Sequence, residues 1–75
     1  MVFDKLKQII VDELGVDATD VTLEASIADD LGADSLDAVE LIMAIEDEFE
    51  ISVSDDKAQD FKTVGQIVEF IEGEI

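Results

Sequence analysis

Apolar residues in the first part of this chain recur at intervals of three and four, the spacing that places side chains on one face of a helix. Phe3, Leu6, Ile10 and Leu14 follow this spacing, and Ile9 widens the apolar face. The glycine that comes next is typical of a helix end. We therefore predict an amphipathic helix over residues 2–14.

Residues 16–34 show no sustained period and form an unusually long connection for a chain of 75 residues. Loops of this length are commonly functional or disordered. We expect this one to be ordered, with a short helical turn near residues 28–31, because its apolar side chains can pack on the core. Those side chains are Val16, Val21, Leu23, Ile27 and Leu31.

A second long helix is predicted at about residues 35–50, since Asp34 is a good N-cap and Asp37 makes an acidic first turn. Beyond it, Ile51 and Val53 are spaced as in a short strand, but no partner strand is visible. Ser54 is a candidate cap for a short third helix.

The last helix is predicted to begin at a capping box, because Thr63 is followed three residues later by Gln66. We expect it to end at Gly73. The fold class is therefore all-α: a small four-helix bundle of three longer helices and one short helix, with a long loop between the first two. Residues 1–75 are expected to form a single domain.

The composition excludes several classes of chemistry within this chain. It has no histidine and no cysteine, so Ser-His or Cys-His catalysis and zinc sites built from those ligands are excluded. Twenty-one acidic residues and four lysines give a net charge of −17. Such a field repels nucleic acids and anionic membranes and attracts basic protein surfaces. No nucleic-acid partner and no membrane insertion are expected.

The first residues argue against a signal peptide, because Asp4, Lys5 and Lys7 interrupt any apolar run. With Met1 at the start, we expect a cytoplasmic protein and a monomer. An organelle form lacking its transit peptide is the alternative.

The stretch from Leu31 to Asp37 joins the long loop to the second helix, and Gly32 permits a tight turn there. Ser35 falls in the first helical turn, where backbone N–H groups lack internal partners. A phosphate ester on its hydroxyl would be favoured by those groups and by the helix dipole. Taken alone, this short string is more typical of a serine that merely caps a helix.

The whole chain, however, resembles the acyl carrier proteins of fatty acid synthesis. The resemblance covers essentially all of the sequence and centres on the motif DLGADSLD, from Asp30 to Asp37. The further matching segments are Leu14-Gly15-Val16, Val39-Glu40-Leu41, Glu48-Phe49 and Thr63-Val64-Gly65.

This resemblance implies a carrier and not an enzyme. A separate phosphopantetheinyl transferase would attach 4'-phosphopantetheine from coenzyme A to Ser35, between Asp34 and Leu36. The thiol of the arm would carry acyl intermediates as thioesters to the enzymes of fatty acid biosynthesis. The arm would thereby supply the thiol that the chain itself lacks.

The helical period divides the second helix into two faces. Ala38, Leu41, Ile42, Ile45 and Phe49 should face the core, and Leu36, Glu40, Met43 and Asp47 the opposite side. Resemblance supports a docking face for enzymes with basic patches, although scattered surface apolar residues would look the same. The expected partner-binding residues are Leu36, Asp37, Val39, Glu40, Met43, Glu46 and Asp47.

The resemblance also implies that the acyl chain is sheltered between the second and third helices. The residues expected near it are Ile45, Val53, Ala58, Phe61 and Ile67, for which ordinary core packing is an equal interpretation. The sequence departs from the family pattern at Ser54, where proline is frequent, and at Phe61, where a smaller aliphatic residue is frequent. The bulky ring leaves the preferred chain length open.

Three alternatives stand beside this interpretation, the first a carrier of another pathway and the other two from different classes. A carrier of polyketide or another acyl-transfer pathway would share the same serine and fold, although Asp34 and the acidity favour fatty acid synthesis. A calcium-binding protein would need the twelve-residue EF-hand loop, which no segment matches. An acidic mimic of nucleic acid would not need Ser35. No specific metal site is expected, only loose binding of divalent cations at Asp29, Asp30, Asp34, Asp37, Asp47, Asp55 or Asp56.

Overall fold

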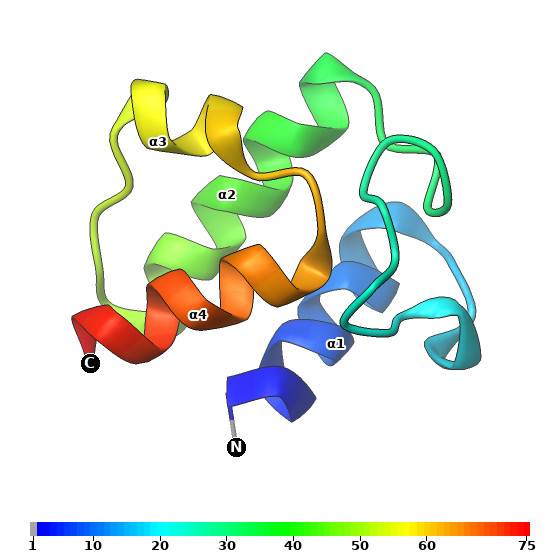
Figure 1. Ribbon diagram of the computed structural model, residues 1–75, viewed down its shortest axis with the longest axis horizontal. Coiled ribbons are helices and arrows are strands. Elements are labelled where there is room, and N and C mark those ends of the chain that lie inside the picture. Colours follow the sequence, from blue (N-terminus) through cyan, green and yellow to red (C-terminus); the bar gives the residue numbers. More distant parts are fainter. Residues whose placement is uncertain (1) are drawn as a thin grey trace.

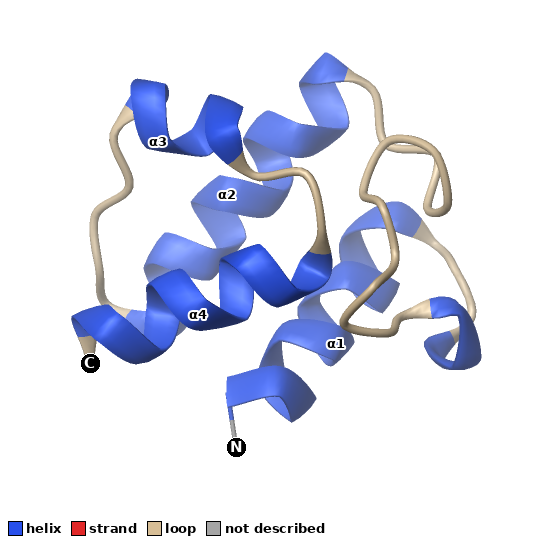
Figure 2. Ribbon diagram, in the orientation of Figure 1, coloured by secondary structure: helices blue, strands red, loops and turns tan. Residues whose placement is uncertain are grey.

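The computed structural model describes residues 2–75; Met1, which begins the expected domain, lies outside the described residues. Its elements are α1 (Val2–Leu14), the 3₁₀ turn η1 (Ala18–Asp20), α2 (Ser35–Phe49), α3 (Asp55–Asp60) and α4 (Val64–Glu74). Figure 2 shows no strand among these residues, and the expected bundle of three longer helices and one short helix is confirmed.

The core is built where α1 packs against α2 and α4. Each of these helices contributes an apolar stripe of residues that are almost completely buried, and each fully buried Leu or Ile side chain stabilises the fold by about 1.5–3 kcal/mol. The most deeply buried members are Leu6, Ile10, Leu41, Ile45, Val64, Ile67 and Ile71. In the view of Figure 1, α4 passes in front of the lower part of α2, α3 lies at the upper left and the long loop at the right.

The predicted helix starts are confirmed by their caps. Asp34 accepts from the backbone of Asp37, and Thr63 and Gln66 form the expected capping box. Ser54 Oγ accepts from the amide of Lys57 at 3.2 Å, which opens α3. Each cap satisfies amides that the first helical turn leaves without partners.

The predicted helix ends are confirmed only in part. Gly15 adopts φ +69° after α1, and its amide donates to Val11 O at 2.9 Å, as a C-terminal glycine does. Gly73 was predicted to end the last helix, but α4 continues to Glu74. The prediction was wrong because Gly73 keeps a helical backbone instead of the left-handed one that would stop the helix.

The long loop is ordered by burial and by backbone hydrogen bonds. Val21, Ile27 and Leu31 are buried as expected, and Val16 is half-buried. Leu23 is 48% exposed, so its predicted place in the core was wrong. Its carbonyl instead accepts from the amide of Gly65 at 2.9 Å. The loop is therefore held at Leu23 by its backbone.

Two more backbone hydrogen bonds tie this loop to the connection between α3 and α4. Ile27 N donates to Lys62 O at 2.9 Å, and Val64 N donates to Ala25 O at 3.1 Å. Residues 27–30 form turns, near the helical turn expected at 28–31, while η1 was not predicted. The loop is thus fixed between α1 and the segment that begins α4.

The connection from α2 to α3 has no strand, in agreement with the missing partner for Ile51 and Val53. Glu50 ends α2 in the left-handed conformation, with φ 54°. The carboxylate of Glu46 then accepts from the amide of Val53 at 2.7 Å. This hydrogen bond fixes the path of the chain toward α3.

Candidate functional site

Ser35 is the first residue of α2, and its side chain is exposed. The two aspartates around it form a reciprocal capping box. Asp34 Oδ1 accepts from Asp37 N at 2.9 Å, and Asp37 Oδ2 accepts from Asp34 N at 3.3 Å. Both carboxylates are therefore occupied by backbone amides of the same turn.

The capping box leaves two amides free at this helix end. The amides of Ser35 and Leu36 donate to no acceptor within residues 2–75. Unpaired amides and the positive end of the helix dipole make a helix start favourable for an anion. A phosphate ester on Ser35 Oγ would meet them next to its point of attachment.

The chain before Ser35 is held in place by the end of the long loop. Gly32 has φ +70°, a left-handed conformation that suits glycine. On either side of it, Leu31 is buried and Ala33 N donates to Ile27 O at 3.1 Å. These contacts anchor the turn that leads to Ser35, which is itself exposed.

The outer face of α2 lies beside Ser35 and is exposed, as predicted. It contains an unusual set of large apolar side chains in water: Leu36 is 74% exposed, Val39 56% and Met43 60%. Glu40 and Asp47 are exposed between and beyond them. No basic residue lies within α2. The outer face of α2 therefore combines apolar contact area with negative charge.

Two of the residues expected on this face have internal partners instead of free carboxylates. Asp37 caps α2, and Glu46 is half-buried against the amide of Val53. The sequence shows no sign of the second contact, because residues seven positions apart with a helix end between them have no fixed relation in sequence. The predicted core face is correct, with Leu41 and Ile45 buried and Ala38, Ile42 and Phe49 half-buried.

Comparison with known proteins identifies the family to which this arrangement belongs. Residues 4–71 match the family described as "Phosphopantetheine attachment site". The acyl carrier protein of Clostridium acetobutylicum is 56% identical over 71 residues, which cover 95% of this chain and 92% of that protein. The chain belongs to the family of acyl carrier proteins. It therefore acts as a carrier with 4'-phosphopantetheine as its prosthetic group, and is not a catalyst of that family's reactions.

Other comparisons give the same family. The acyl carrier protein of Clostridium perfringens is 58% identical over 69 residues, covering 92% of this chain and 91% of that protein. A solved structure from Mycobacterium tuberculosis, described as an acyl carrier protein, superposes with a TM-score of 0.91 at 34% identity over 97% of both chains. The helical fold and the long loop are thus those of an acyl carrier protein.

The residues of this acyl carrier protein fit the prosthetic group. The group needs an accessible hydroxyl and a place for its phosphate; Ser35 is exposed, and two amides without acceptors lie beside it. When bound, the group supplies a terminal thiol that holds acyl chains as thioesters. The chain has no cysteine with which to do this itself.

The residues expected near the acyl chain differ in their exposure. Ile45 and Ile67 are 1% and 2% exposed, while Val53, Ala58 and Phe61 are half-buried. Ile45 belongs to α2, Ala58 to α3 and Ile67 to α4, while Val53 precedes α3 and Phe61 follows it. Ile45 and Ile67 belong to the buried core, and Phe61 packs against it.

Phe61 has a neighbour that the sequence reasoning missed. Its ring lies 5.4 Å from that of Phe70 on α4, with an interplanar angle of 62°. Lys57 stands over both rings. The spacing of Lys57 and Phe61, one helical turn apart, was a readable signal for that pair, whereas Phe70 comes from a different helix.

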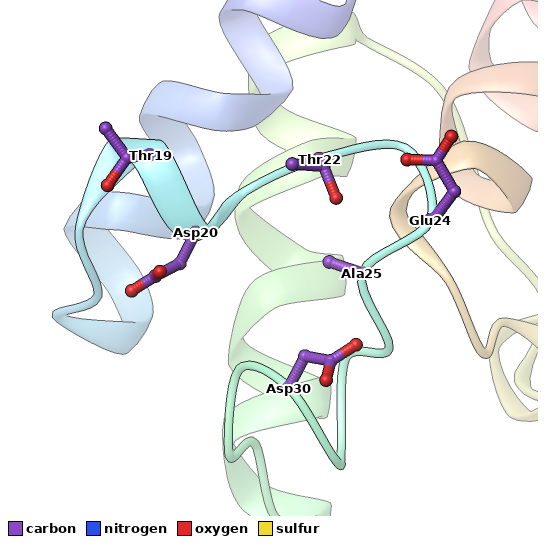
Figure 3. A pocket seen from close by; sticks show the side chains of 6 residues that line it. All are labelled: Thr19, Asp20, Thr22, Glu24, Ala25 and Asp30. Atoms are coloured by element: carbon purple, nitrogen blue, oxygen red, sulfur yellow. The ribbon is translucent and has the colours of Figure 1, made fainter.

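Figure 3 shows a separate hollow in the long loop, lined by threonine and acidic side chains. The carboxylate of Asp30 accepts from Ser26 N at 2.7 Å, so it serves the turn that it closes. Within residues 2–75, no group of three or more acidic side chains is arranged to hold a metal ion. The residues that line the hollow in the long loop are Thr19, Asp20, Thr22, Glu24, Ala25 and Asp30.

None of the helices described here combines the length and apolar character needed to cross a bilayer.

Proposed function

We propose that Ser35 is the attachment residue and that this protein carries acyl intermediates, as thioesters on the arm, to the enzymes of fatty acid biosynthesis. The single observation that carries the proposal is the exposed Ser35 hydroxyl at a helix start with two unpaired amides. Asp34 holds the helix start in shape, and Leu36 contributes one of those amides. The pathway is supported by the acidic residue before Ser35 and by the net charge of −17.

Attachment requires a phosphopantetheinyl transferase. The Ser35 oxygen forms a bond to the phosphorus of the arm, the pyrophosphate bond of coenzyme A breaks, and the nucleotide half leaves. The hydroxyl proton passes to a general base in the complex with the transferase. The new phosphodiester keeps one negative charge beside the amides of Ser35 and Leu36.

The protein is tested with a transferase, coenzyme A and intact-mass measurement. The unmodified chain should gain the mass of one phosphopantetheine group, and Ser35→Ala should gain none. Ser52→Ala is the matched control, because Ser52 is exposed and caps no helix. Labelling of Ser35→Ala, or failure of the natural chain to be labelled, would refute the assignment.

We also propose that partner enzymes dock on α2 through basic patches. The proposed contacts are Leu36, Asp37, Val39, Glu40, Met43, Glu46 and Asp47, of which Asp37 and Glu46 have carboxylates already engaged with backbone amides. Exposed charges steer association over about 8 Å at physiological ionic strength, so docking should be fast and salt-sensitive. A carrier must leave each enzyme, and weak contacts of this kind permit it.

For the cargo, we propose that the acyl chain enters between α2 and α3 beside Ile45, Val53, Ala58, Phe61 and Ile67. Each sheltered CH₂ group is worth about 0.8 kcal/mol. Longer acyl groups should therefore raise the thermal midpoint of the loaded protein until the space is filled. A midpoint independent of chain length would refute shelter in this core.

The assignment to fatty acid synthesis is tested by transfer. The loaded protein should transfer its acyl group to a fatty acid elongating enzyme. Transfer to a polyketide enzyme alone would assign the protein to the alternative pathway. We further propose a cytoplasmic monomer forming one carrier domain. Sedimentation of the purified chain tests the monomer, and fractionation of the source cells tests the location.

A further inference from the structure

A hollow on the side of α3 and α4 carries a pair of aromatic rings. We call it the aromatic hollow; its volume is about 380 Å³. Phe61 and Phe70 meet in it edge to face, with centroids 5.4 Å apart. Both rings are half-buried, so each keeps part of its surface open to the hollow. The full lining is Lys57, Asp60, Phe61, Gln66, Glu69 and Phe70.

A cation of the chain itself occupies this hollow. Lys57 Nζ lies 6.0 Å from the Phe61 centroid and 5.6 Å from that of Phe70. These distances are near the outer limit for a cation–π interaction of about 6 Å. Within residues 2–75, the ion pair found within 4 Å joins Lys5 to Glu48, so Lys57 has no carboxylate at contact distance. Lys57 is therefore held only weakly beside the two rings.

The rim of the hollow is acidic and its wall is fixed. Asp60 and Glu69 are exposed at the edge and add negative charge beside the rings. Gln66 forms part of the wall, where its Oε1 accepts from the amides of Lys62 and Thr63. The hollow therefore presents aromatic and anionic groups that accept a cation, on a surface separate from the outer face of α2.

We propose that the aromatic hollow receives an arginine side chain of a partner protein, which displaces Lys57. An arginine guanidinium stacks on aromatic rings and pairs with carboxylates in a planar fork, whereas an ammonium is compact and strongly hydrated. The net charge of −17 attracts basic protein surfaces to the chain as a whole, and Asp60 and Glu69 supply the negative charge at the hollow itself. This contact goes beyond the docking on α2 and does not depend on modification of Ser35.

The test uses the chain without its arm and the peptide acetyl-Gly-Arg-Gly-amide, followed by NMR of the phenylalanine rings. The peptide should shift the ring signals of Phe61 and Phe70. Lys57→Ala should tighten binding about threefold, because the competing cation is removed. Lys62→Ala is the matched control, since it removes the same charge from an exposed lysine that stands over neither ring.

Equal tightening in Lys57→Ala and Lys62→Ala would overturn the proposal, because attraction to the net charge would then explain both. The same titration is made with acetyl-Gly-Lys-Gly-amide, and equal ring shifts with this lysine peptide would overturn the choice of arginine. Phe70→Leu should weaken binding of the arginine peptide while circular dichroism shows intact helices. Binding at full strength in that folded variant would also refute the site. Phosphopantetheine loading of Ser35 is measured separately, so its result is independent of these outcomes.

Discussion

The hydrogen bond from Val53 N to Glu46 Oε2 is expected to determine how firmly α3 is attached to the rest of the molecule. The bond is 2.7 Å long and partly buried, and it crosses the turn in which Glu50 takes the left-handed conformation. Replacing Glu46 by Ala removes the acceptor, while Glu46→Gln keeps an oxygen at the same position. Both variants remove one negative charge, so the charge change cancels in their difference, and what remains is the hydrogen bond opposed by the better helix propensity of alanine.

Its contribution can be worked out from the kind of bond. Hydrogen bonds to charged groups contribute about 1.5–3 kcal/mol and neutral ones about 0.5–1.5 kcal/mol. Alanine is the better helix former, and removal of a charge relieves repulsion, so both side effects favour Glu46→Ala. We expect the free energy of unfolding of Glu46→Ala to be about 1–2 kcal/mol lower than that of the natural chain. In a domain of this size that lowers Tm by roughly 4–16 °C. The free energy of unfolding of Glu46→Gln should fall by about half as much.

The assay is urea denaturation of the three proteins together with hydrogen exchange at the amide of Val53. Exchange at Val53 should be faster in Glu46→Ala than in Glu46→Gln, since only the second retains an acceptor. Equal stability of the two variants, or unchanged exchange at Val53 in Glu46→Ala, would refute the reasoning. Glu46 would then be a surface residue whose role lies in docking alone.

Three further outcomes are expected. Asp34→Ala should lower the free energy of unfolding by about 1 kcal/mol in urea denaturation, because the N-cap acceptor is lost, whereas Asp34→Ser should not; an unchanged midpoint in the alanine variant would contradict the capping role. Glu40→Lys should slow association with the transferase more than Glu72→Lys on α4 does, with helical content unchanged in both; equal slowing would show that net charge, not the outer face of α2, guides docking. Raising salt from low to physiological concentration should raise Tm, because it screens a net charge of −17; a constant Tm would argue against self-repulsion.

The sequence predicted the elements whose causes are local. The start of α2 depends on Asp34 and the start of α4 on Thr63 and Gln66, and these residues lie within one turn of the amides that they cap. The apolar period identified the buried and exposed sides of α2, including the exposure of Leu36 and Met43. The place of Ser35 in the first turn of α2 was likewise predictable, because the residues that start the helix are its immediate neighbours.

What the sequence could not predict depends on contacts between distant segments. Leu23 has an apolar side chain, yet the structure uses its carbonyl to hold Gly65, and the side chain is left in water. The pairing of Phe61 with Phe70 depends on the angle between α3 and α4. Gly73 stays helical because a glycine ends a helix only where its backbone turns left-handed, which the residue type permits but does not require.

The acidic residues of this chain have two kinds of role, and their effects on binding must be interpreted accordingly. The carboxylates of Asp30, Asp37 and Glu46 accept from backbone amides and hold a turn, a helix start and a connection in place. Substituting any of them changes the local fold as well as the charge. Glu40 and Asp47 are exposed on α2 and make no such hydrogen bond within the described chain. A loss of enzyme binding therefore reports directly on docking only at these two positions, because at the other three the same loss would follow from displacement of the backbone around Ser35 or α3.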